Sequence, residues 1–328
     1  MRVFVTRQLV GNALERLAQH VEVDLWTGEG QPDAATMRAR LAGCDGLLCL
    51  LTDRVDASLI EACPSLRAVA SCSVGLDHVD VKALTARKIP LGYTPGVLVE
   101  TTADLAFALL LSASRRIVEA DRFVREGHWT PARKWEPDML VGRDLSGATL
   151  GIIGLGEIGQ AVARRARGFG MRIISWTRSG RTADGIESVS LDTLLSESDF
   201  VSLHVALAPE TRNLLDAKAL SRMKPGAVLI NTARGGIIDE VALATALREG
   251  KLAAAGLDVF EKEPVALDHP LLQLPNVVVA PHIGSASIAT RTKMADLTVD
   301  NILAGLTGKP MRHCANPEVY GALMPSGS

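Results

Sequence analysis

Short apolar runs alternate with longer amphipathic segments from one end of the chain to the other. Parallel strands joined by helical crossovers give this pattern, because such strands are buried on both faces while each helix buries only one. The sequence therefore predicts an α/β fold. The strands predicted for a first sheet cover residues 3–5, 46–50, 68–70 and 90–93, and those for a second cover 149–153, 172–176, 200–204, 227–231, 256–258 and 277–280.

Helical patterns fill the segments between these strands, and three of them bear on the domain organisation. The segment 101–120 starts with Thr101 followed by Asp104, which predicts a capped helix leading from the first group of strands to the second. The segment 160–168 follows a glycine-rich turn. The last helix, 286–306, comes after the final strand, so it must pack on a domain that is already built.

Length and charge narrow the class of protein further. A chain of 328 residues with 47% hydrophobic composition predicts two domains. The 35 basic and 37 acidic residues are scattered, so no basic face indicates nucleic acid or an anionic membrane as a partner. Five cysteines without metal-ligand spacing indicate reduced thiols, and the N-terminus lacks an export signal, which together favour the cytoplasm.

A phosphate-binding turn follows the apolar strand at 149–153. Its sequence is Gly154, Leu155, Gly156, Glu157, Ile158, Gly159, and a helical pattern begins directly after it. The glycines allow a tight turn, close approach of a pyrophosphate to backbone N–H groups, and close packing of helix on strand. Strand, turn and helix together predict a dinucleotide-binding domain.

The residues after the second strand of this domain indicate which dinucleotide binds. NAD-binding sites usually place a carboxylate there for the ribose 2′-hydroxyl, but here the first carboxylate is Asp184. The positions before it can pair with or donate to a 2′-phosphate: Thr177, Arg178, Ser179 and Arg181. The sequence therefore predicts NADP(H) as the preferred cofactor, with NAD(H) also possible. The alternative is that both arginines are solvated loop residues.

Three later strands each end in polar residues, at 231–236, 258–264 and 281–285. Ligands of a doubly wound sheet bind at the carboxyl ends of its strands, so these residues are expected to line one crevice. Reduction of a 2-oxo acid needs a cation for the substrate, a proton donor for the developing alkoxide, and a group that keeps this donor charged. Arg234, His282 and Glu263 form one complete set, because a carboxylate beside the histidine stabilises the imidazolium.

With these residues in place, the chain resembles the D-2-hydroxyacid dehydrogenase family, and within it the glyoxylate and hydroxypyruvate reductases. The resemblance covers nearly the whole chain and rests on SVGLDHVD at 73–80, TPGVL at 94–98, ADLAFALLL at 103–111, GIIGLGEIGQ at 151–160, NTARGGIID at 231–239, AAGLDVFEKEP at 254–264 and PHIGSA at 281–286.

The resemblance implies a role for individual residues. Arg234 would bind the substrate, His282 would be the general acid and base, and Glu263 would be its partner. The backbone amides around Val74 and Gly75 would hold the substrate carboxylate, and Leu51 begins a segment, 51–54, that would close one side of the pocket. Asp258 would hold the nicotinamide carboxamide. Further cofactor contacts would come from Thr102, His204, Thr232, Ala233 and Gly284.

The resemblance also implies the larger organisation. A flavodoxin-like substrate domain would comprise residues 1–98 and 288–328, and a Rossmann cofactor domain would comprise residues 99–287. The product would have D stereochemistry, and two copies would form a homodimer through the cofactor domain. The animal enzymes carry a tryptophan near the position of Met139 that reaches the partner's site, whereas the nearby tryptophans here are Trp129 and Trp135.

Several alternatives stay open at this point. Asp258 could instead cap a turn, His204 could be a core residue, and Ser285 could either touch the hydroxyl of hydroxypyruvate or cap the following helix. Other 2-oxo acids are possible substrates, including 2-ketogluconate, phenylpyruvate and the oxo acid of phosphoglycerate. A non-catalytic nucleotide-sensing protein resembling transcriptional corepressors is the alternative from another class.

Overall fold

Both groups of predicted strands form parallel sheets in the computed structural model, which describes residues 1–323. The chain divides into two compact units. One unit joins Met1–Leu98 to the chain from Ala286 onward, and the other is Val99–Ser285. The α/β class with two doubly wound sheets is therefore confirmed.

The first unit contains a five-stranded sheet in the order β2-β1-β3-β4-β5. This is the flavodoxin-like strand order, as predicted. Its strands are β1 (Arg2–Val5), β2 (Glu22–Leu25), β3 (Gly46–Cys49), β4 (Ala68–Ser71) and β5 (Leu91–Gly92). Its helices are α1 (Ala13–Ala18), α2 (Ala34–Leu41), α3 (Ala57–Ala62), α4 (Val81–Ala86), α11 (Ile288–Leu306) and the 3-10 helix η4 (Pro317–Leu323).

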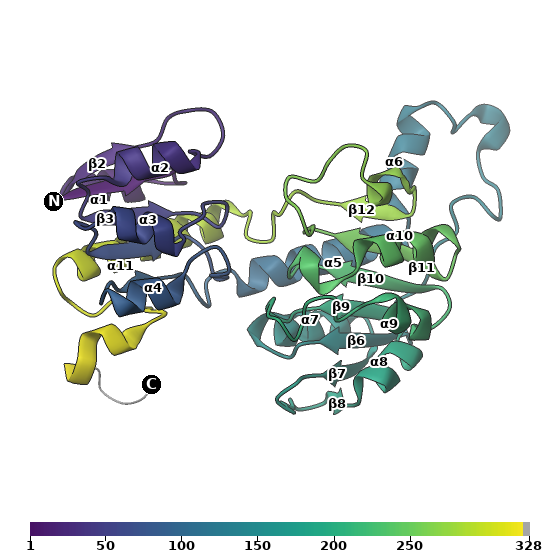
Figure 1. Cartoon of the computed structure of the whole chain (residues 1–328). Coiled ribbons are helices and arrows are strands. Elements are labelled where there is room, and N and C mark those ends of the chain that lie inside the picture. Colours follow the sequence, from purple (N-terminus) through teal and green to yellow (C-terminus); the bar gives the residue numbers. More distant parts are fainter. Residues whose placement is uncertain (324–328) are drawn as a thin grey trace. The chain divides into compact units, whose positions relative to one another are not determined.

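Successive residues of these strands point into two different cores, one on each face of the sheet. Phe4 and Leu47 pack with the side of the sheet that α2 and α3 cover, whereas Val3, Val5 and Leu48 pack with α1 and α11. Helix α11 is thus part of the first unit, although the whole second unit separates it in the sequence from the strands on which it packs (Figure 1).

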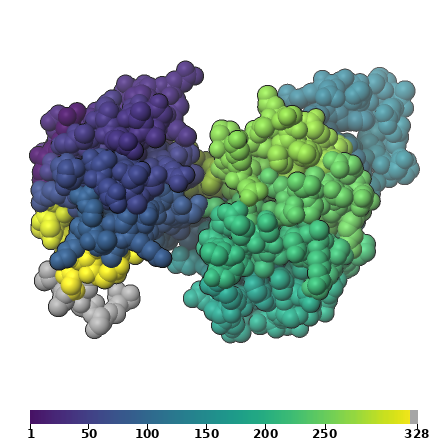
Figure 2. Space-filling view, viewed as in Figure 1, coloured from purple at the N-terminus to yellow at the C-terminus, as the bar shows by residue number. Residues whose placement is uncertain are grey.

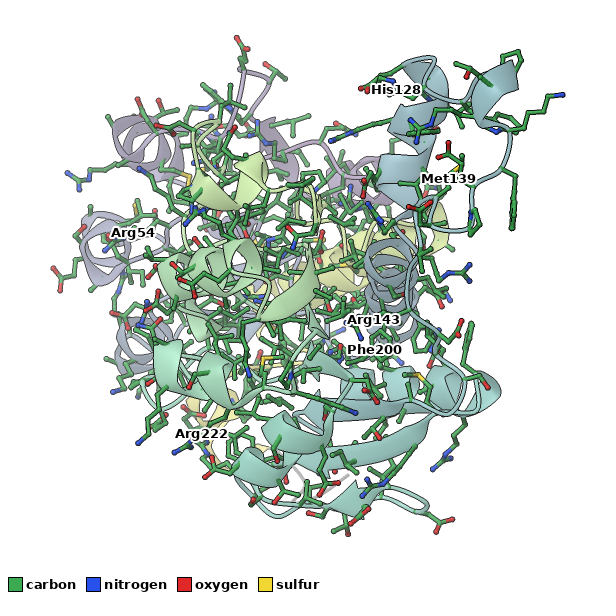
Figure 3. The ribbon with its side chains drawn as sticks, turned by 90° about the vertical axis from the view of Figure 1, so that its right-hand side faces the viewer. Arg54, His128, Met139, Arg143, Phe200 and Arg222 are labelled. Carbon is green, nitrogen blue, oxygen red and sulfur yellow. The ribbon has the colours of Figure 1, made fainter. Side chains whose placement is uncertain are left out.

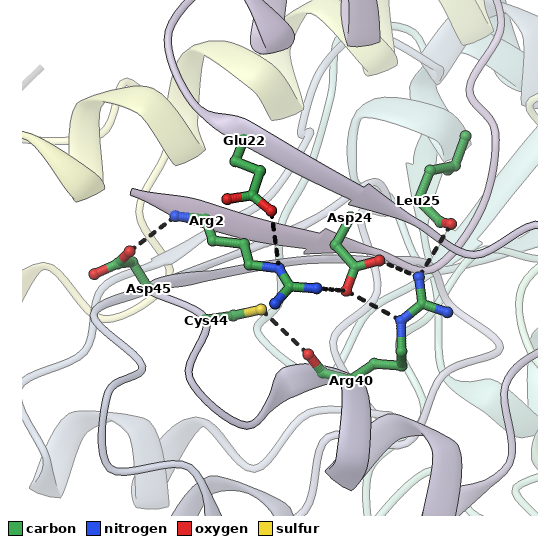
Figure 4. A network of polar contacts seen from close by, with 7 residues as sticks. All are labelled: Arg2, Glu22, Asp24, Leu25, Arg40, Cys44 and Asp45. Carbon is green, nitrogen blue, oxygen red and sulfur yellow. Dashed lines mark hydrogen bonds and ion pairs between the residues drawn. The ribbon is translucent and has the colours of Figure 1, made fainter.

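A polar network ties the edge of this sheet to helix α2. The Asp24 carboxylate on β2 accepts hydrogen bonds from Arg2 on β1 at 2.8 Å and from Arg40 Nε on α2 at 3.0 Å (Figure 4). The Asp24 side chain is only 8% exposed, and hydrogen bonding to Arg40 lowers its pKa in spite of the opposing effect of burial. The network holds an edge strand that buries few apolar side chains of its own.

The second unit contains a seven-stranded sheet in the order β12-β11-β10-β9-β6-β7-β8. Six of these strands, from β8 to β11, follow the order of a complete dinucleotide-binding sheet, and β12 extends it beside β11. The strands are β6 (Thr149–Ile153), β7 (Arg172–Trp176), β8 (Glu187–Ser188), β9 (Phe200–Leu203), β10 (Ala227–Asn231), β11 (Leu252–Leu257) and β12 (Val277–Val279).

Helices cover both faces of this sheet. One core includes residues of α5 and α7, and the other includes residues of α8, α9 and α10. The helices are α5 (Val99–Ser114), α6 (Ile117–Arg125), α7 (Glu157–Gly168), α8 (Leu191–Glu197), α9 (Ala217–Arg222) and α10 (Glu240–Arg248), with the 3-10 helices η1 (Pro131–Arg133), η2 (Gly235–Ile237) and η3 (Pro270–Gln273).

The predicted helix at 101–120 is two helices, and its predicted start is wrong. Helix α5 begins at Val99, so Thr101 lies inside it, and the chain breaks at Arg116, whose φ is 54°. The segment from α6 to residue 141 then projects from the body of the second unit, and it carries His128 and Met139 (Figures 2 and 3). Several of its apolar side chains are exposed, namely Ile117, Val124, Trp129, Trp135 and Val141.

Two strands were missed by the sequence pattern. β2 has alternating polar residues and lies at a sheet edge, and β8 has only two residues, both exposed. Neither contains the continuous apolar run that identifies a buried parallel strand. Strand β11 also starts at Leu252 rather than at residue 256, because its alanines gave a weak signal. Within residues 1–323, no helix is both long and apolar enough to span a bilayer.

Candidate active site

The glycine turn between β6 and α7 is open where a pyrophosphate would approach it. Gly154 has a φ of 99°, and a Cβ on it would lie 2.6 Å from the backbone oxygen of His204. A Cβ on Gly159 would lie 2.1 Å from the oxygen of Gly154. No side chain caps the N-terminus of α7, and a Cβ on Gly156 would meet nothing within 4 Å. The free N–H groups of this helix end therefore suit a phosphate.

Arg178 and Arg181 lie on the loop after β7, and both are exposed to solvent. β7 pairs with β6, the strand that leads into the glycine turn. The Thr177 hydroxyl donates to the backbone oxygen of Arg181 at 3.3 Å, which closes the loop into a turn. Arg178 pairs with Glu210 at 3.2 Å. No sequence pattern indicates this pair, because the partners lie 32 residues apart on different loops.

Arg234 follows the end of β10, where the backbone packs very tightly. The side-chain oxygen of Asn231 accepts a hydrogen bond from the Ala233 N–H at 3.0 Å, and its side-chain nitrogen donates one to the Arg234 carbonyl at 2.8 Å. At the next residue, Gly235, a Cβ would lie 1.8 Å from the carbonyl carbon of Phe260. The segment carrying Arg234 thus contacts the segment that leads to Glu263.

His282 and Glu263 form a direct pair. His282 Nδ1 lies 2.7 Å from Glu263 Oε2, and the other oxygen of Glu263 accepts the Phe260 N–H at 2.9 Å. Burial alone would raise the pKa of Glu263, but hydrogen bonds from His282 and Phe260, with the nearby charge of Arg234, lower it. The carboxylate is therefore ionised at neutral pH, and it orients the imidazole through Nδ1, leaving Nε2 for another partner.

Asp258 holds the turn on which His282 lies. The aspartate is buried, its backbone oxygen accepts the His282 N–H at 2.8 Å, and its two carboxylate oxygens accept the N–H groups of Ile283 at 2.7 Å and Gly284 at 2.9 Å. The turn gives His282 a φ of 54°, which is rare for a residue other than glycine. Capping of this turn was one of the two alternatives for Asp258, and the structure contains it.

Other residues predicted to contact the cofactor lie in the same unit. The buried Thr102 hydroxyl on α5 donates to the Gly284 carbonyl at 3.1 Å. His204 follows β9, its Nε2 lies 2.8 Å from the Ser202 hydroxyl, and burial lowers its pKa to about 4, so its ring is neutral at pH 7. The Thr232 hydroxyl is buried without a hydrogen-bond partner. Such an orphaned group fits a site that a polar ligand completes.

The predicted substrate-binding residues of the first unit lie on two neighbouring loops. Leu51 follows β3, while Val74 and Gly75 follow β4. The loops are joined by parallel bridging of Val55 to Val79, with the Val55 N–H donating to the His78 carbonyl at 2.9 Å. Each loop therefore supports the other.

Buried polar side chains fix both loops, and sequence reasoning missed them. The Asp53 carboxylate accepts the Thr6 hydroxyl at 2.5 Å and the Leu50 N–H at 2.7 Å. On the second loop, the Ser73 hydroxyl donates to the Gly75 carbonyl at 2.8 Å and contacts Ser71 at 2.7 Å. Aspartate and serine in loops are too common for the sequence to single these out.

Ser285 does not cap the final helix. Ser287 is the N-cap of α11 and accepts the Thr290 N–H at 3.1 Å, so the capping alternative for Ser285 is wrong. Among the residues that the structure describes, no three histidine, cysteine or acidic side chains are grouped as metal ligands.

Comparison with known proteins identifies the class to which this fold and site belong. The model of the "D-isomer specific 2-hydroxyacid dehydrogenase, NAD binding domain" matches residues 107–284. The chain is 52% identical over 323 residues to a glyoxylate reductase of Korarchaeum cryptofilum, covering 97% of this chain and 96% of that protein.

Two solved structures share the fold over nearly the whole chain. The TT0316 protein of Thermus thermophilus superposes with a TM-score of 0.92 at 47% identity, covering 96% of this chain and 100% of that one. An NADPH-dependent glyoxylate/hydroxypyruvate reductase of Sinorhizobium meliloti, solved with NADP and malonate, has a TM-score of 0.86 at 37% identity, covering 96% and 97%.

The chain belongs to the D-isomer specific 2-hydroxyacid dehydrogenases. It is an NAD(P)-dependent oxidoreductase that acts on the CH–OH group of a 2-hydroxy acid, or in reverse on the corresponding 2-oxo acid.

Proposed function

We propose that this enzyme is an NADP(H)-preferring reductase of glyoxylate and hydroxypyruvate. The observation that carries the cofactor preference is the loop after β7, which offers Arg178 and Arg181 and contains no carboxylate before Asp184. The relatives named glyoxylate reductase support the substrate, and the Sinorhizobium meliloti reductase, named for both oxo acids, supports substrate and cofactor together.

The chemistry follows from the pair at His282. Arg234 would bind the oxo acid by its carboxylate and polarise its carbonyl, and His282 would donate a proton from Nε2 to the developing alkoxide oxygen. Glu263 would orient the imidazole through Nδ1 and stabilise its charged form. The nicotinamide, when bound, supplies the hydride.

The remaining roles are assigned residue by residue. The first unit would be the substrate domain, with Leu51, Val74 and Gly75 binding the substrate, and Ser285 of the second unit would contact the hydroxyl of hydroxypyruvate. The second unit would be the cofactor domain, with its glycine turn holding the pyrophosphate and Arg178 pairing with the 2′-phosphate. Asp258 would accept a hydrogen bond from the carboxamide in addition to capping its turn.

A substrate panel tests this proposal directly. NADPH and NADH oxidation would be followed with glyoxylate, hydroxypyruvate, pyruvate, phenylpyruvate and 2-ketogluconate, comparing kcat/KM. We expect the highest values for the first two acids with NADPH. A higher kcat/KM for any of the other three acids would contradict the proposed substrates. Equal kcat/KM with NADPH and NADH would contradict the proposed preference for NADP(H).

Arg178→Gln should raise the KM of NADPH by about 10-fold or more, since a hydrogen bond to a charged group contributes about 1.5–3 kcal/mol. The KM of NADH should change little. Arg172→Gln is the matched control, because Arg172 is also an exposed arginine of the β7 region but pairs with Glu187 and Glu197. Equal changes for both cofactors would contradict the phosphate contact.

Glu263→Gln should change the pH profile of oxo-acid reduction at its acid end. Since hydrogen bonds from His282 and Phe260 lower the pKa of Glu263, its carboxylate should lose its effect only below the ordinary range of glutamate. The glutamine variant should lack that acid limb. Its kcat/KM should also be lower than that of the wild type at neutral pH, because the amide cannot replace the carboxylate that lies 2.7 Å from His282 Nδ1. Steady-state kcat/KM from about pH 3 to pH 8 measures this, and the same acid limb in both proteins would refute the role of Glu263.

We also propose that the enzyme is a cytoplasmic homodimer formed through the second unit. The exposed apolar side chains between Ile117 and Val141 support this, because a second copy would bury them. Light scattering after size exclusion should give twice the chain mass, and a monomer at micromolar concentration would count against the dimer.

A further inference from the structure

Glu210 places a carboxylate beside Arg178, although the loop after β7 has no carboxylate of its own before Asp184. It lies on the loop that follows β9, and its Oε2 lies 3.2 Å from Arg178 Nη1. Both side chains are exposed, at 61% for Glu210 and 69% for Arg178, so ligands in solution can reach the pair.

The loop carrying Glu210 borders the glycine turn. β9 pairs with β6, and the strand order of the sheet reverses between these two strands. Dinucleotides bind at such a reversal. A Cβ on Gly154 would lie 2.6 Å from the His204 oxygen and 2.8 Å from Val205, so the start of the β9 loop is in contact with the turn.

The backbone beside Glu210 is firmly held. The Thr211 hydroxyl accepts the Ala208 N–H at 2.8 Å and donates to the Ala206 carbonyl at 2.7 Å. The Asn213 N–H donates to the Gly236 carbonyl at 2.9 Å. The backbone that carries Glu210 is therefore held by a buried neighbour, because Thr211 is only 8% exposed.

We propose that Glu210 limits the preference for NADP(H) by competing with the 2′-phosphate for Arg178. This inference rests on the proposed contact between Arg178 and the phosphate. A phosphate that pairs with Arg178 must displace or share the Glu210 carboxylate, and the two anions repel each other. NAD(H) has a neutral 2′-hydroxyl, which meets no such repulsion and can donate a hydrogen bond to Glu210.

The size of the effect should be modest. Exposed ion pairs contribute up to about 1 kcal/mol, so Glu210→Gln should tighten binding of a 2′-phosphate by about two- to five-fold. Binding of a ligand without that phosphate should stay the same or weaken. The difference should shrink at high ionic strength, because exposed charges are screened.

The test uses two nucleotides that lack nicotinamide. 2′,5′-ADP carries the 2′-phosphate and 5′-ADP does not, and calorimetry measures their dissociation constants with the full-length enzyme at low and high salt. The Glu210→Gln variant should bind 2′,5′-ADP two- to five-fold more tightly and should not bind 5′-ADP more tightly. Glu197→Gln is the matched control, because Glu197 is an exposed carboxylate paired with Arg172.

Two further variants separate this inference from the proposed function. If Arg178→Gln leaves 2′,5′-ADP binding unchanged, the proposed phosphate contact itself fails. If Arg178→Gln weakens binding but Glu210→Gln does not tighten it, only the role of Glu210 fails. In the double variant the gain from Glu210→Gln should be smaller than in the wild-type background. An equal gain in both backgrounds, or an equal gain for 5′-ADP, would overturn the competition for Arg178.

Discussion

His282→Gln should lower kcat for glyoxylate reduction by about 10²- to 10⁴-fold, the usual contribution of general acid catalysis. Glutamine can donate a hydrogen bond but cannot transfer a proton, so the alkoxide would have to take its proton from water. The dissociation constant of NADPH, measured by fluorescence, should change little because the glycine turn and Arg178 are untouched.

His269→Gln is the matched control for this change. His269 lies in the same unit, and its Nε2 lies 3.1 Å from a carboxylate oxygen of Glu240, so it is also a histidine paired with a glutamate. Its variant should retain kcat within about two-fold. If His282→Gln kept more than a tenth of the wild-type kcat, the proton donor would have to be another group.

Gly235→Ala should unfold or distort the second unit more than any exchange of a surface residue. The added methyl would lie 1.8 Å from the Phe260 carbonyl carbon and 2.1 Å from the Glu261 nitrogen, and backbone cannot move aside as a side chain can. We expect a loss of about 3 kcal/mol in the free energy of unfolding, at the upper end for overpacking, and a fall in Tm of roughly 5–10 °C. Calorimetry measures both.

Activity should fall together with stability in this variant, because the same clash separates the segments of Arg234 and Glu263. Gly168→Ala serves as the control: this glycine is exposed in α7 and a Cβ there would meet nothing within 4 Å. That change should be neutral or slightly stabilising. A Gly235→Ala protein with wild-type Tm and kcat/KM would contradict the close packing of Gly235 against Phe260.

The sequence predicted the structure correctly where a strand is a continuous run of buried apolar residues. The apolar runs of β6, β7 and β9 are continuous, and the glycine turn follows β6 directly, so strand, turn and helix could be placed from the sequence. The two edge strands could not be predicted, for the opposite reason. β2 and β8 bury little, and the Asp24 network that fixes β2 joins residues far apart in the chain.

The site was predictable only in part, for a similar reason. Arg234, Glu263 and His282 each lie in a distinctive motif that follows a strand, so the sequence could single them out. The structure brings Glu263 and His282 into contact, which their spacing in the sequence could not establish. Glu210 and Asp53 make contacts with residues that lie far from them in the sequence. Their importance depends on three-dimensional neighbours, and no local pattern in a single sequence records those.

The left-handed backbone of His282 bears on the stability of the folded protein. A side chain at a φ of 54° costs about 1 kcal/mol relative to glycine, and here the surrounding turn and the buried Asp258 offset that cost. Glycine would relieve this strain, but it would also leave the Glu263 carboxylate without the imidazole that lies 2.7 Å from it. The two changes act on the free energy of unfolding in opposite directions, so this position can keep a histidine without a large net cost in stability.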